Sequence, residues 1–189
     1  MEKKDQIFIY HDLKPMIKYL KVAAGKGARV PFFGHILSTG CSLVSTDFKR
    51  MHIVENTDED IILPEGIYYI DLKNKYLVRS DDINFPDHKR VLQKYKLQTQ
   101  YLVRHPVSSI PVIFTDIIIK MSKNWNTKET WTVEYDHLRD YLKNIPSGYF
   151  LEVQIPVEPS NPLILVSSQQ YSKFRYMAFI MPVLFNYYE

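Results

Sequence analysis

Four cationic side chains stand as two pairs in separate segments of the chain, each pair one helical turn apart. Lys14 and Lys18 form the first pair, and Arg139 and Lys143 form the second. Like charges at i and i+4 on a helix repel slightly, so neither pair stabilises its own helix. A polyanion would offset that repulsion, because phosphate oxygens bind lysine and arginine without regard to base sequence. The spacing predicts two basic helix faces suited to nucleic acid, with ordinary solubilising surface residues as the alternative.

Two histidine–aspartate neighbours, His11-Asp12 and Asp136-His137, have side chains suitable as metal ligands. Each pair stands at the start of a predicted helix, where aspartate caps exposed amides and interacts favourably with the helix dipole. We therefore expect capping rather than metal binding. The acidic run at 58–60 predicts a solvated loop, although paired carboxylates can also bind a cation.

Covalent catalysis finds little support in the sequence. Cys41 stands beside a glycine in a predicted β-region without a visible Cys–His–Asn arrangement, so a small buried thiol is expected. The run Gly25-Lys26-Gly27 lacks the spacing and the Lys-Ser/Thr ending of a phosphate-binding loop. We predict a protein that is not an enzyme and that uses no cofactor and no metal.

The composition is that of an ordinary globular protein. The chain has 189 residues, of which 46% are hydrophobic and 24% charged, with a formal net charge of +3. This length suits one domain or two small ones, and the mild positive charge permits an anionic partner without requiring one. One cysteine excludes an intramolecular disulfide. Since no signal peptide or membrane-spanning run of roughly 20 apolar residues is visible, a cytoplasmic location without membrane contact is expected.

Short strands and three helices are predicted along the chain. Apolar residues recur at helical spacing after Asp12, and Gly25 and Gly27 are expected to end this first helix. Further helices are predicted at 86–95 and 136–145. Strand-like runs bounded by turn residues lie at 6–10, 32–38, 42–46, 50–55, 67–72, 75–79, 99–104, 111–121, 131–135, 149–156, 162–168 and 174–184.

An internal repeat is the most informative feature of the sequence. Residues 10–18 read Tyr-His-Asp-Leu-Lys-Pro-Met-Ile-Lys, and residues 135–143 read Tyr-Asp-His-Leu-Arg-Asp-Tyr-Leu-Lys. Each segment follows a short β-run and precedes several strands. A strand–helix–multistrand unit used twice indicates two-fold pseudosymmetry, with apolar helix faces on the sheets and basic faces outward.

Four stretches of the sequence, in their order along the chain, resemble the bacterial DNA sliding clamps, the β subunit of the replicative DNA polymerase. Clamp domains are built from two strand–helix–multistrand halves, and the resemblance covers about two-thirds of this sequence. The first stretch is the helix and strand at 13–37, and the second is Leu43-Val44-Ser45-Thr46-Asp47-Phe48. The third is Phe85-Pro86-Asp87-His88-Lys89-Arg90-Val91-Leu92, and the fourth runs from Leu138 to the Met181-Pro182-Val183-Leu184 finish.

The resemblance implies an α+β sliding-clamp fold with antiparallel sheets and two helices on one face. We expect a single clamp-like domain over 1–189, with half repeats at 6–56 and 129–186 and an insertion at about 57–128. Family clamps carry three domains per chain, so a chain of this length would need to self-associate to close a ring. The matching helix positions make the candidate DNA-binding residues Lys14, Lys18, Lys21, Lys26, Arg29, Arg139 and Lys143.

The resemblance also implies a replication accessory function, in which the protein binds double-stranded DNA and tethers DNA polymerase or other replication proteins. Clamps hold partner peptides in an apolar groove, and the matching positions are Met181, Pro182, Val183 and Leu184. The alternative for these residues is the end of a core strand. The alternative function is a clamp-fold interaction module that does not encircle DNA, and an enzyme of unrecognised type is the third.

Overall fold

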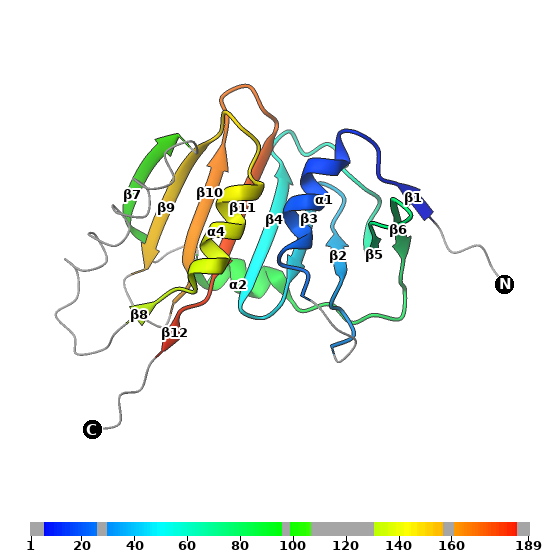
Figure 1. Cartoon of the computed structure of the whole chain (residues 1–189), viewed down its shortest axis with the longest axis horizontal. Helices are drawn as coiled ribbons and strands as arrows, with labels where there is room; N and C mark the ends of the chain where they lie inside the picture. Colours follow the sequence, from blue (N-terminus) through cyan, green and yellow to red (C-terminus); the bar gives the residue numbers. More distant parts are fainter. Residues whose placement is uncertain (1–5, 26–29, 96–98, 107–130, 157–160, 185–189) are drawn as a thin grey trace.

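A single antiparallel sheet forms the centre of the protein in the computed structural model, which describes residues 6–25, 30–95, 99–106, 131–156 and 161–184. Its ten strands are all paired antiparallel (Figure 1). Their order is β1 (Gln6–Phe8), β6 (Tyr76–Arg79), β5 (Gly66–Asp71), β2 (His35–Ser38), β3 (Ser42–Thr46), β4 (Arg50–Asn56), β11 (Phe174–Ile180), β10 (Leu163–Ser168), β9 (Phe150–Pro156) and β7 (Thr99–Pro106). A separate two-stranded ribbon pairs β12 (Val183–Leu184) with β8 (Trp131–Thr132).

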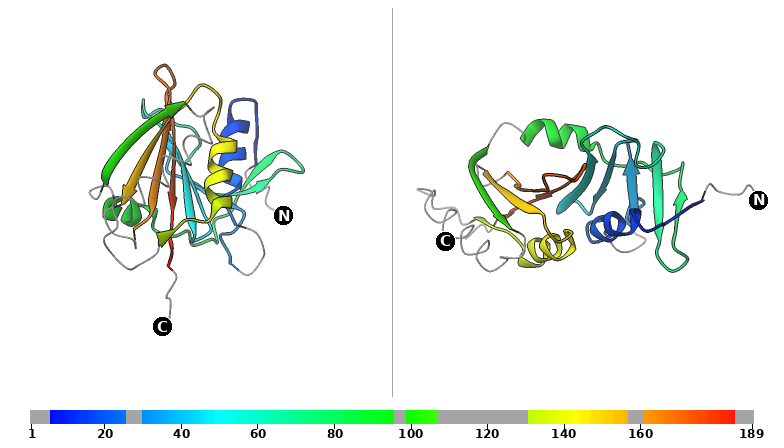
Figure 2. Two further views of the ribbon diagram at one scale, coloured as in Figure 1. Left: turned by 60° about the vertical axis from the view of Figure 1, so that its left-hand side comes forward. Right: turned by 90° about the horizontal axis from the view of Figure 1, so that it is seen from above.

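Helices cover both faces of this sheet. Helices α1 (Leu13–Lys21) and α4 (Tyr135–Asn144) lie side by side on one face, which we call the helix face. Helix α2 (His88–Tyr95) crosses the other face, which we call the outer face (Figure 2). The fold is therefore α+β with two helices on one side of an antiparallel sheet, as the sequence predicts.

The predicted repeat is present in the order and pairing of the elements. The order β1-α1-β2-β3-β4 recurs as β8-α4-β9-β10-β11. In the sheet, the order β2-β3-β4-β11-β10-β9 is symmetric about its centre, because β4 corresponds to β11, β3 to β10 and β2 to β9 in the repeat. The two halves meet where β4 pairs with β11, with Ile53 opposite Met177 at the middle of the register. This central pairing is the pseudo-two-fold junction of the molecule.

Alternation along the central strands builds two hydrophobic layers. On β4, Val54 joins the main core under α1 and α4, whereas Met51 and Ile53 belong to the smaller outer cluster near α2. Because β4 lies between these two layers, it is buried along most of its length.

The segment between the two halves extends the sheet at both of its edges. The hairpin β5–β6, predicted as strands at 67–72 and 75–79, lies at one edge, where β5 pairs with β2 and β6 pairs with β1. Strand β7 pairs with β9 at the opposite edge. Helix α2 connects these edges across the outer face (Figure 2). The division of the chain at 57–128 stays a prediction, and the predicted strand at 111–121 lies outside the described residues.

Several predicted boundaries differ from the structure by one to a few residues, and two of the differences have a clear physical reason. The predicted strand at 174–184 is two strands, because Pro182 has no N–H to donate. The last hydrogen bond of the β11–β4 pairing is the one from the Met181 N–H to the carbonyl of Lys49 at 2.8 Å. Helix α1 ends at Lys21, before Gly25. Gly25 has a φ of +70°, and a Cβ there would lie 2.7 Å from the ring of Phe33, so the loop requires glycine at this position. Gly27 lies outside the described residues.

None of the helices in the described residues is long and apolar enough to cross a membrane.

Candidate functional site

Helix α1 presents free cations on the helix face. Lys14 and Lys18 are exposed, and Lys21 is half-buried at the last turn. The helix sequence contains no acidic residue. Among the described residues, none of these three lysines forms an ion pair. The other two candidates of this half, Lys26 and Arg29, lie outside the described residues.

Helix α4 differs from α1, because its arginine is neutralised within the helix. Arg139 Nη2 lies 2.8 Å from Asp136 Oδ1 and 3.9 Å from Asp140 Oδ1. Its guanidinium also lies over the ring of Tyr135, 5.8 Å from the centroid. Lys143 is exposed and unpaired among the described residues. The two helices therefore share a face but not the same charge, contrary to the predicted equivalence of the pairs.

The starts of both helices also differ from the predicted aspartate caps. Asp12 has helical backbone angles and makes no side-chain cap, because a capping residue needs an extended backbone to reach the first amides. Asp136 lies inside α4, and Glu134 precedes the helix. The prediction of capping by these aspartates is therefore wrong.

Ion pairs and hydrogen bonds occupy the residues at these helix starts. His11 Nδ1 lies 3.3 Å from Asp12 Oδ1 in solvent. His137 Nε2 lies 2.9 Å from Glu134 Oε2, and Lys49 Nζ donates to Glu134 Oε1 at 3.1 Å. The hydrogen bond from Lys49 lowers the pKa of Glu134. The described part of the chain holds no group of three or more metal-ligating side chains.

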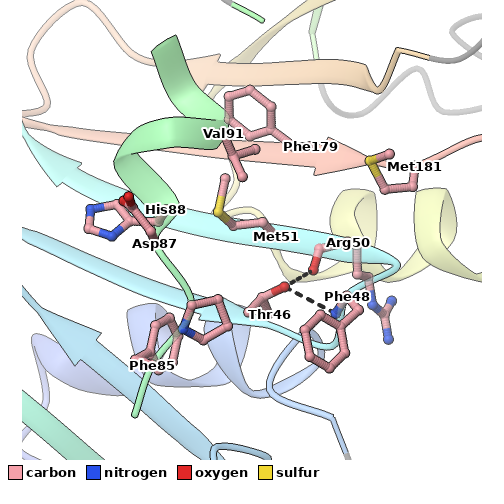
Figure 3. A pocket seen from close by; sticks show the side chains of 11 residues that line it. Thr46, Phe48, Arg50, Met51, Phe85, Asp87, His88, Val91, Phe179 and Met181 are labelled. Atoms are coloured by element: carbon pink, nitrogen blue, oxygen red, sulfur yellow. Dashed lines mark hydrogen bonds between the residues drawn. The ribbon is translucent and has the colours of Figure 1, made fainter. Parts of the chain in front are cut away.

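An apolar pocket opens on the outer face where three segments meet (Figure 3). Its volume is about 130 Å³, close to the roughly 150 Å³ in which an engineered cavity holds a benzene molecule. The turn between β3 and β4, the segment at the start of α2 and the end of β11 supply its walls. The lining residues are Thr46, Phe48, Arg50, Met51, Phe85, Pro86, Asp87, His88, Val91, Phe179 and Met181.

Of the predicted groove residues, the structure places Met181 in this pocket and leaves Pro182 half-buried beside it in the chain. Val183 and Leu184 form β12, and their side chains lie outside the described part. Sequence reasoning missed the remaining lining residues. A signal for them existed, because the Thr46-Asp47-Phe48 and Phe85-to-Leu92 stretches of the resemblance converge here with the Met181 stretch.

The turn between β3 and β4 is held by hydrogen bonds at both ends. The Thr46 hydroxyl donates to the carbonyl of Arg50 at 2.8 Å, and Asp47 Oδ1 accepts from the N–H groups of Lys49 and Arg50. This network places Phe48 at the tip with a φ of 69°, in the left-handed region. The predicted turn at Thr46-Asp47 is thereby confirmed, and it carries an exposed phenylalanine into the pocket wall.

The guanidinium of Arg50 points away from the pocket and contacts the β3–β4 turn, the end of α1 and α4. Nε lies 3.1 Å from Asp47 Oδ2, and Nη1 lies 2.9 Å from Asp140 Oδ2 on α4. Nη2 donates to the carbonyl of Val22 at the end of α1 at 2.5 Å. Arg50 therefore connects the pocket wall with the helix face.

The fold defined by this sheet and its paired helices is that of the DNA sliding clamps. Among solved structures, the H. pylori Beta clamp in complex with Diflunisal matches with a TM-score of 0.59 and 15% identity over 97% of this chain and 67% of that chain. The beta subunit from DNA polymerase of Streptococcus pyogenes matches with a TM-score of 0.56 and 15% identity, over 97% of this chain and 66% of that one. The DNA polymerase III subunit beta from Pseudomonas aeruginosa gives 0.55 and 13%, over 95% and 66%.

These matches show the fold, and the chain spans about two-thirds of the length of each clamp that it matches. No family model and no curated protein matches the sequence. The expected α+β sliding-clamp architecture is confirmed.

Proposed function

We propose that this protein is a sliding-clamp-like replication accessory protein. It binds duplex DNA without sequence preference through the helix face, and it holds a partner such as DNA polymerase at the apolar pocket. It tethers and performs no bond chemistry. The observation that carries the proposal is the row of lysines on α1, which form no ion pair with any residue that the structure describes and lie on the side of the sheet where the resemblance to clamps puts DNA.

The geometry of this row suits a phosphate backbone. Lys14, Lys18 and Lys21 follow the i, i+4, i+7 spacing of one helix face, and seven residues of helix rise about 10 Å. Duplex DNA carries one charge per roughly 1.7 Å of its axis, so several phosphates lie within reach of the row. On α4, Lys143 adds a cation that forms no ion pair within the part of the chain that the structure describes, whereas Arg139 could bind phosphate only in competition with Asp136 and Asp140.

The supporting argument for a partner site is the position of the pocket. Helix α2, whose first residues line the pocket, lies on the opposite side of the sheet from α1 and α4 (Figure 2), so a partner bound at the pocket would leave the helix face free. Its lining is mainly phenylalanine, methionine, valine and proline, and methionine adapts its shape to different apolar partners.

The experiment that tests DNA binding is a salt titration of affinity for a duplex of arbitrary sequence. We expect the logarithm of the affinity to fall linearly with the logarithm of salt concentration. Lys14→Glu with Lys18→Glu should weaken binding strongly and reduce the slope by roughly two. The matched control is Lys73→Glu with Lys75→Glu, the same charge change in the exposed turn between β5 and β6. Equal behaviour of both double variants would contradict the proposal.

Ring formation is a separate part of the proposal. Known clamp rings contain six such domains, so a one-domain chain would need a high-order homo-oligomer. Within the described sheet, β1 and β7 are the outermost strands, and each pairs on one side. Light scattering over a concentration series should give a discrete ring-sized mass. A monomer at every concentration would rule out a ring built from this chain alone.

A second candidate function is a clamp-fold interaction module that binds replication proteins without encircling DNA. The observation that favours it is the neutralisation of Arg139 by Asp136 and Asp140, which removes a cation from the helix face. This candidate predicts weak DNA affinity that Lys14→Glu with Arg139→Glu leaves unchanged. The salt titration therefore separates the two functions.

A further inference from the structure

The guanidinium of Arg50 holds two carboxylates and one carbonyl at the same time. Nε lies 3.1 Å from Asp47 Oδ2, Nη1 lies 2.9 Å from Asp140 Oδ2, and Nη2 donates to the carbonyl of Val22. The Arg50 side chain is only 10% exposed, so its charge depends on these acceptors, because a buried cation without partners is costly. The three contacts fix the planar group in one position between the β3–β4 turn, the end of α1 and α4.

Asp140 on α4 lies between two arginines. Its Oδ2 is 2.9 Å from Arg50 Nη1, whereas its Oδ1 is 3.9 Å from Arg139 Nη2. The first distance is that of a charge-assisted hydrogen bond, and the second is beyond hydrogen-bond range. Asp140 is therefore engaged mainly by Arg50, although Arg139 is close enough to compete for it.

Arg139 consequently has one close carboxylate and not two. Asp136 Oδ1 lies 2.8 Å from Arg139 Nη2, and the Asp136 side chain is 67% exposed. Exposed ion pairs of this kind are weak, so a DNA phosphate can displace Asp136 at little cost. A second carboxylate at hydrogen-bond distance from Arg139 would make that displacement more difficult.

A released Asp140 would neutralise cations of α4. Without Arg50, Asp47 and Asp140 would lose the guanidinium between them, and their like charges would repel each other. Arg139 is already 3.9 Å from Asp140, and Lys143 stands three residues after it, which is ion-pair spacing on a helix. Either new pair would remove positive charge from the helix face.

We propose that Arg50 is a positioning residue for DNA binding, because by holding Asp140 it keeps the cations of α4 available to phosphate. This inference rests on the proposed binding of duplex DNA by the helix face. Arg50 itself has its guanidinium occupied by Asp47, Asp140 and the Val22 carbonyl, so it acts through Asp140 and not by contact with the phosphate.

The first test compares two variants of α4 that carry the same charge change, in the salt titration of affinity for a duplex of arbitrary sequence. Asp136→Asn removes the carboxylate that holds Arg139 and should raise the affinity about two- to five-fold. Asp140→Asn removes a carboxylate that Arg50 already holds, so it should raise the affinity no more than Asp81→Asn, which reports the effect of net charge. Equal increases for Asp136→Asn and Asp140→Asn would overturn the inference and leave the proposed DNA binding standing.

The second test removes Arg50. We expect Arg50→Gln to lower the affinity about two- to five-fold and to reduce the salt slope by roughly one, since one phosphate-binding cation is neutralised. In an Asp140→Asn background, Arg50→Gln should leave both quantities near those of Asp140→Asn alone, because the carboxylate is no longer there to be released. A purely structural role of Arg50 gives the same loss in both backgrounds, and that result would overturn the inference.

Arg175→Gln is the matched control for Arg50→Gln. It removes a guanidinium from an ion pair with Glu55, two residues before Met177 of the outer cluster, and should leave the affinity near that of the wild type. Thermal unfolding establishes whether Arg50→Gln is folded at the temperature of the titration. If it is not, the comparison of Asp136→Asn with Asp140→Asn decides the inference alone. If the wild type has no salt-dependent affinity for the duplex, the inference and the proposed DNA binding fall together.

Discussion

Arg50 and Asp140, 90 positions apart in the sequence, form an ion pair of 2.9 Å between Nη1 and Oδ2. Arg50 begins β4 in the first half of the repeat, and Asp140 lies on α4 in the second half. The same guanidinium holds Asp47 and the carbonyl of Val22. One side chain thus connects the turn of the pocket, the end of α1 and the middle of α4.

Loss of this ion pair should destabilise the fold measurably. The Arg50 side chain is 10% exposed and that of Asp140 is 29% exposed, so solvent screens the pair incompletely. We expect Asp140→Asn to lower the free energy of unfolding by about 1–2 kcal/mol, as for hydrogen bonds to charged groups. Urea unfolding measures the change. The control Asp81→Asn, which removes a surface partner of Arg79, should cost at most about 0.5 kcal/mol.

Stability should fall in mild acid because of His52. This residue is fully buried, its Nδ1–H donates to the carbonyl of Tyr19 at 3.0 Å, and Nε2 has no partner among the described residues. Burial lowers the pKa of His52 from 6.5 to about 3. Between pH 6.5 and pH 3, His52 is therefore protonated in the unfolded chain and neutral in the folded chain. The contribution of neutral His52 to the free energy of unfolding is fully present above pH 6.5 and is lost as the pH falls toward 3.

The check is urea unfolding at several pH values for His52→Asn, which keeps a donor near Nδ1 and cannot titrate. We expect a lower stability at neutral pH and a shallower loss between pH 6.5 and 3 than in the wild type, by up to about 1.4 kcal/mol per pH unit. An unchanged acid slope would assign the effect to other groups. His137 is the first of these, because burial also lowers its pKa.

Tyrosine hydroxyls fasten both helices to β11. The Tyr19 hydroxyl on α1 donates to the carbonyl of Met177 at 2.5 Å, and the Tyr141 hydroxyl on α4 lies 2.9 Å from Ser167 Oγ and 3.1 Å from the carbonyl of Tyr176. Tyr141→Phe should cost about 1–2 kcal/mol, because it leaves buried polar groups without a partner. Tyr141→Phe with Ser167→Ala should cost less than the sum of the single changes in thermal or urea unfolding.

Release of Arg139 should strengthen DNA binding. Asp136 is exposed and holds Arg139 at 2.8 Å, so phosphate must displace it. Asp136→Asn should raise the affinity for duplex DNA by about two- to five-fold, the value of an exposed ion pair, and steepen the salt slope. Asp81→Asn removes the same charge from the β6 end and should leave the affinity near that of the wild type. A rise with both variants would indicate net charge rather than Arg139.

Much of the fold could be predicted from local patterns, since apolar spacing located α1, and the hairpin at β5–β6 follows from alternation around Lys73-Asn74. The matching segments around Tyr10 and Tyr135 also predicted the repeat. The contact of β4 with β11 could not be predicted, because strand patterns do not say which distant strand pairs with Ile53. That choice depends on the packing of both halves together.

In the candidate site, the exposure of single side chains was predictable from the sequence, whereas properties that depend on neighbouring residues were harder to predict. The exposure of Lys14 and Lys18 follows from helical periodicity. The neutralisation of Arg139 had a signal, since Asp136 stands three residues earlier, which is ion-pair spacing on a helix. The left-handed backbone of Phe48 had none, because the residue type disfavours this conformation and the side-chain hydrogen bonds of the neighbouring turn residues impose it.

The pairing of β4 with β11 also has a consequence for synthesis on the ribosome. After Arg50–Asn56 leaves the exit tunnel, more than a hundred further residues must be synthesised before its partner strand, Phe174–Ile180, leaves the tunnel in turn. At about 5–20 residues per second, this edge waits for several seconds or longer. An unpaired apolar strand is a template for aggregation during that time. A chaperone would therefore be most needed while only the first half of the repeat has left the ribosome.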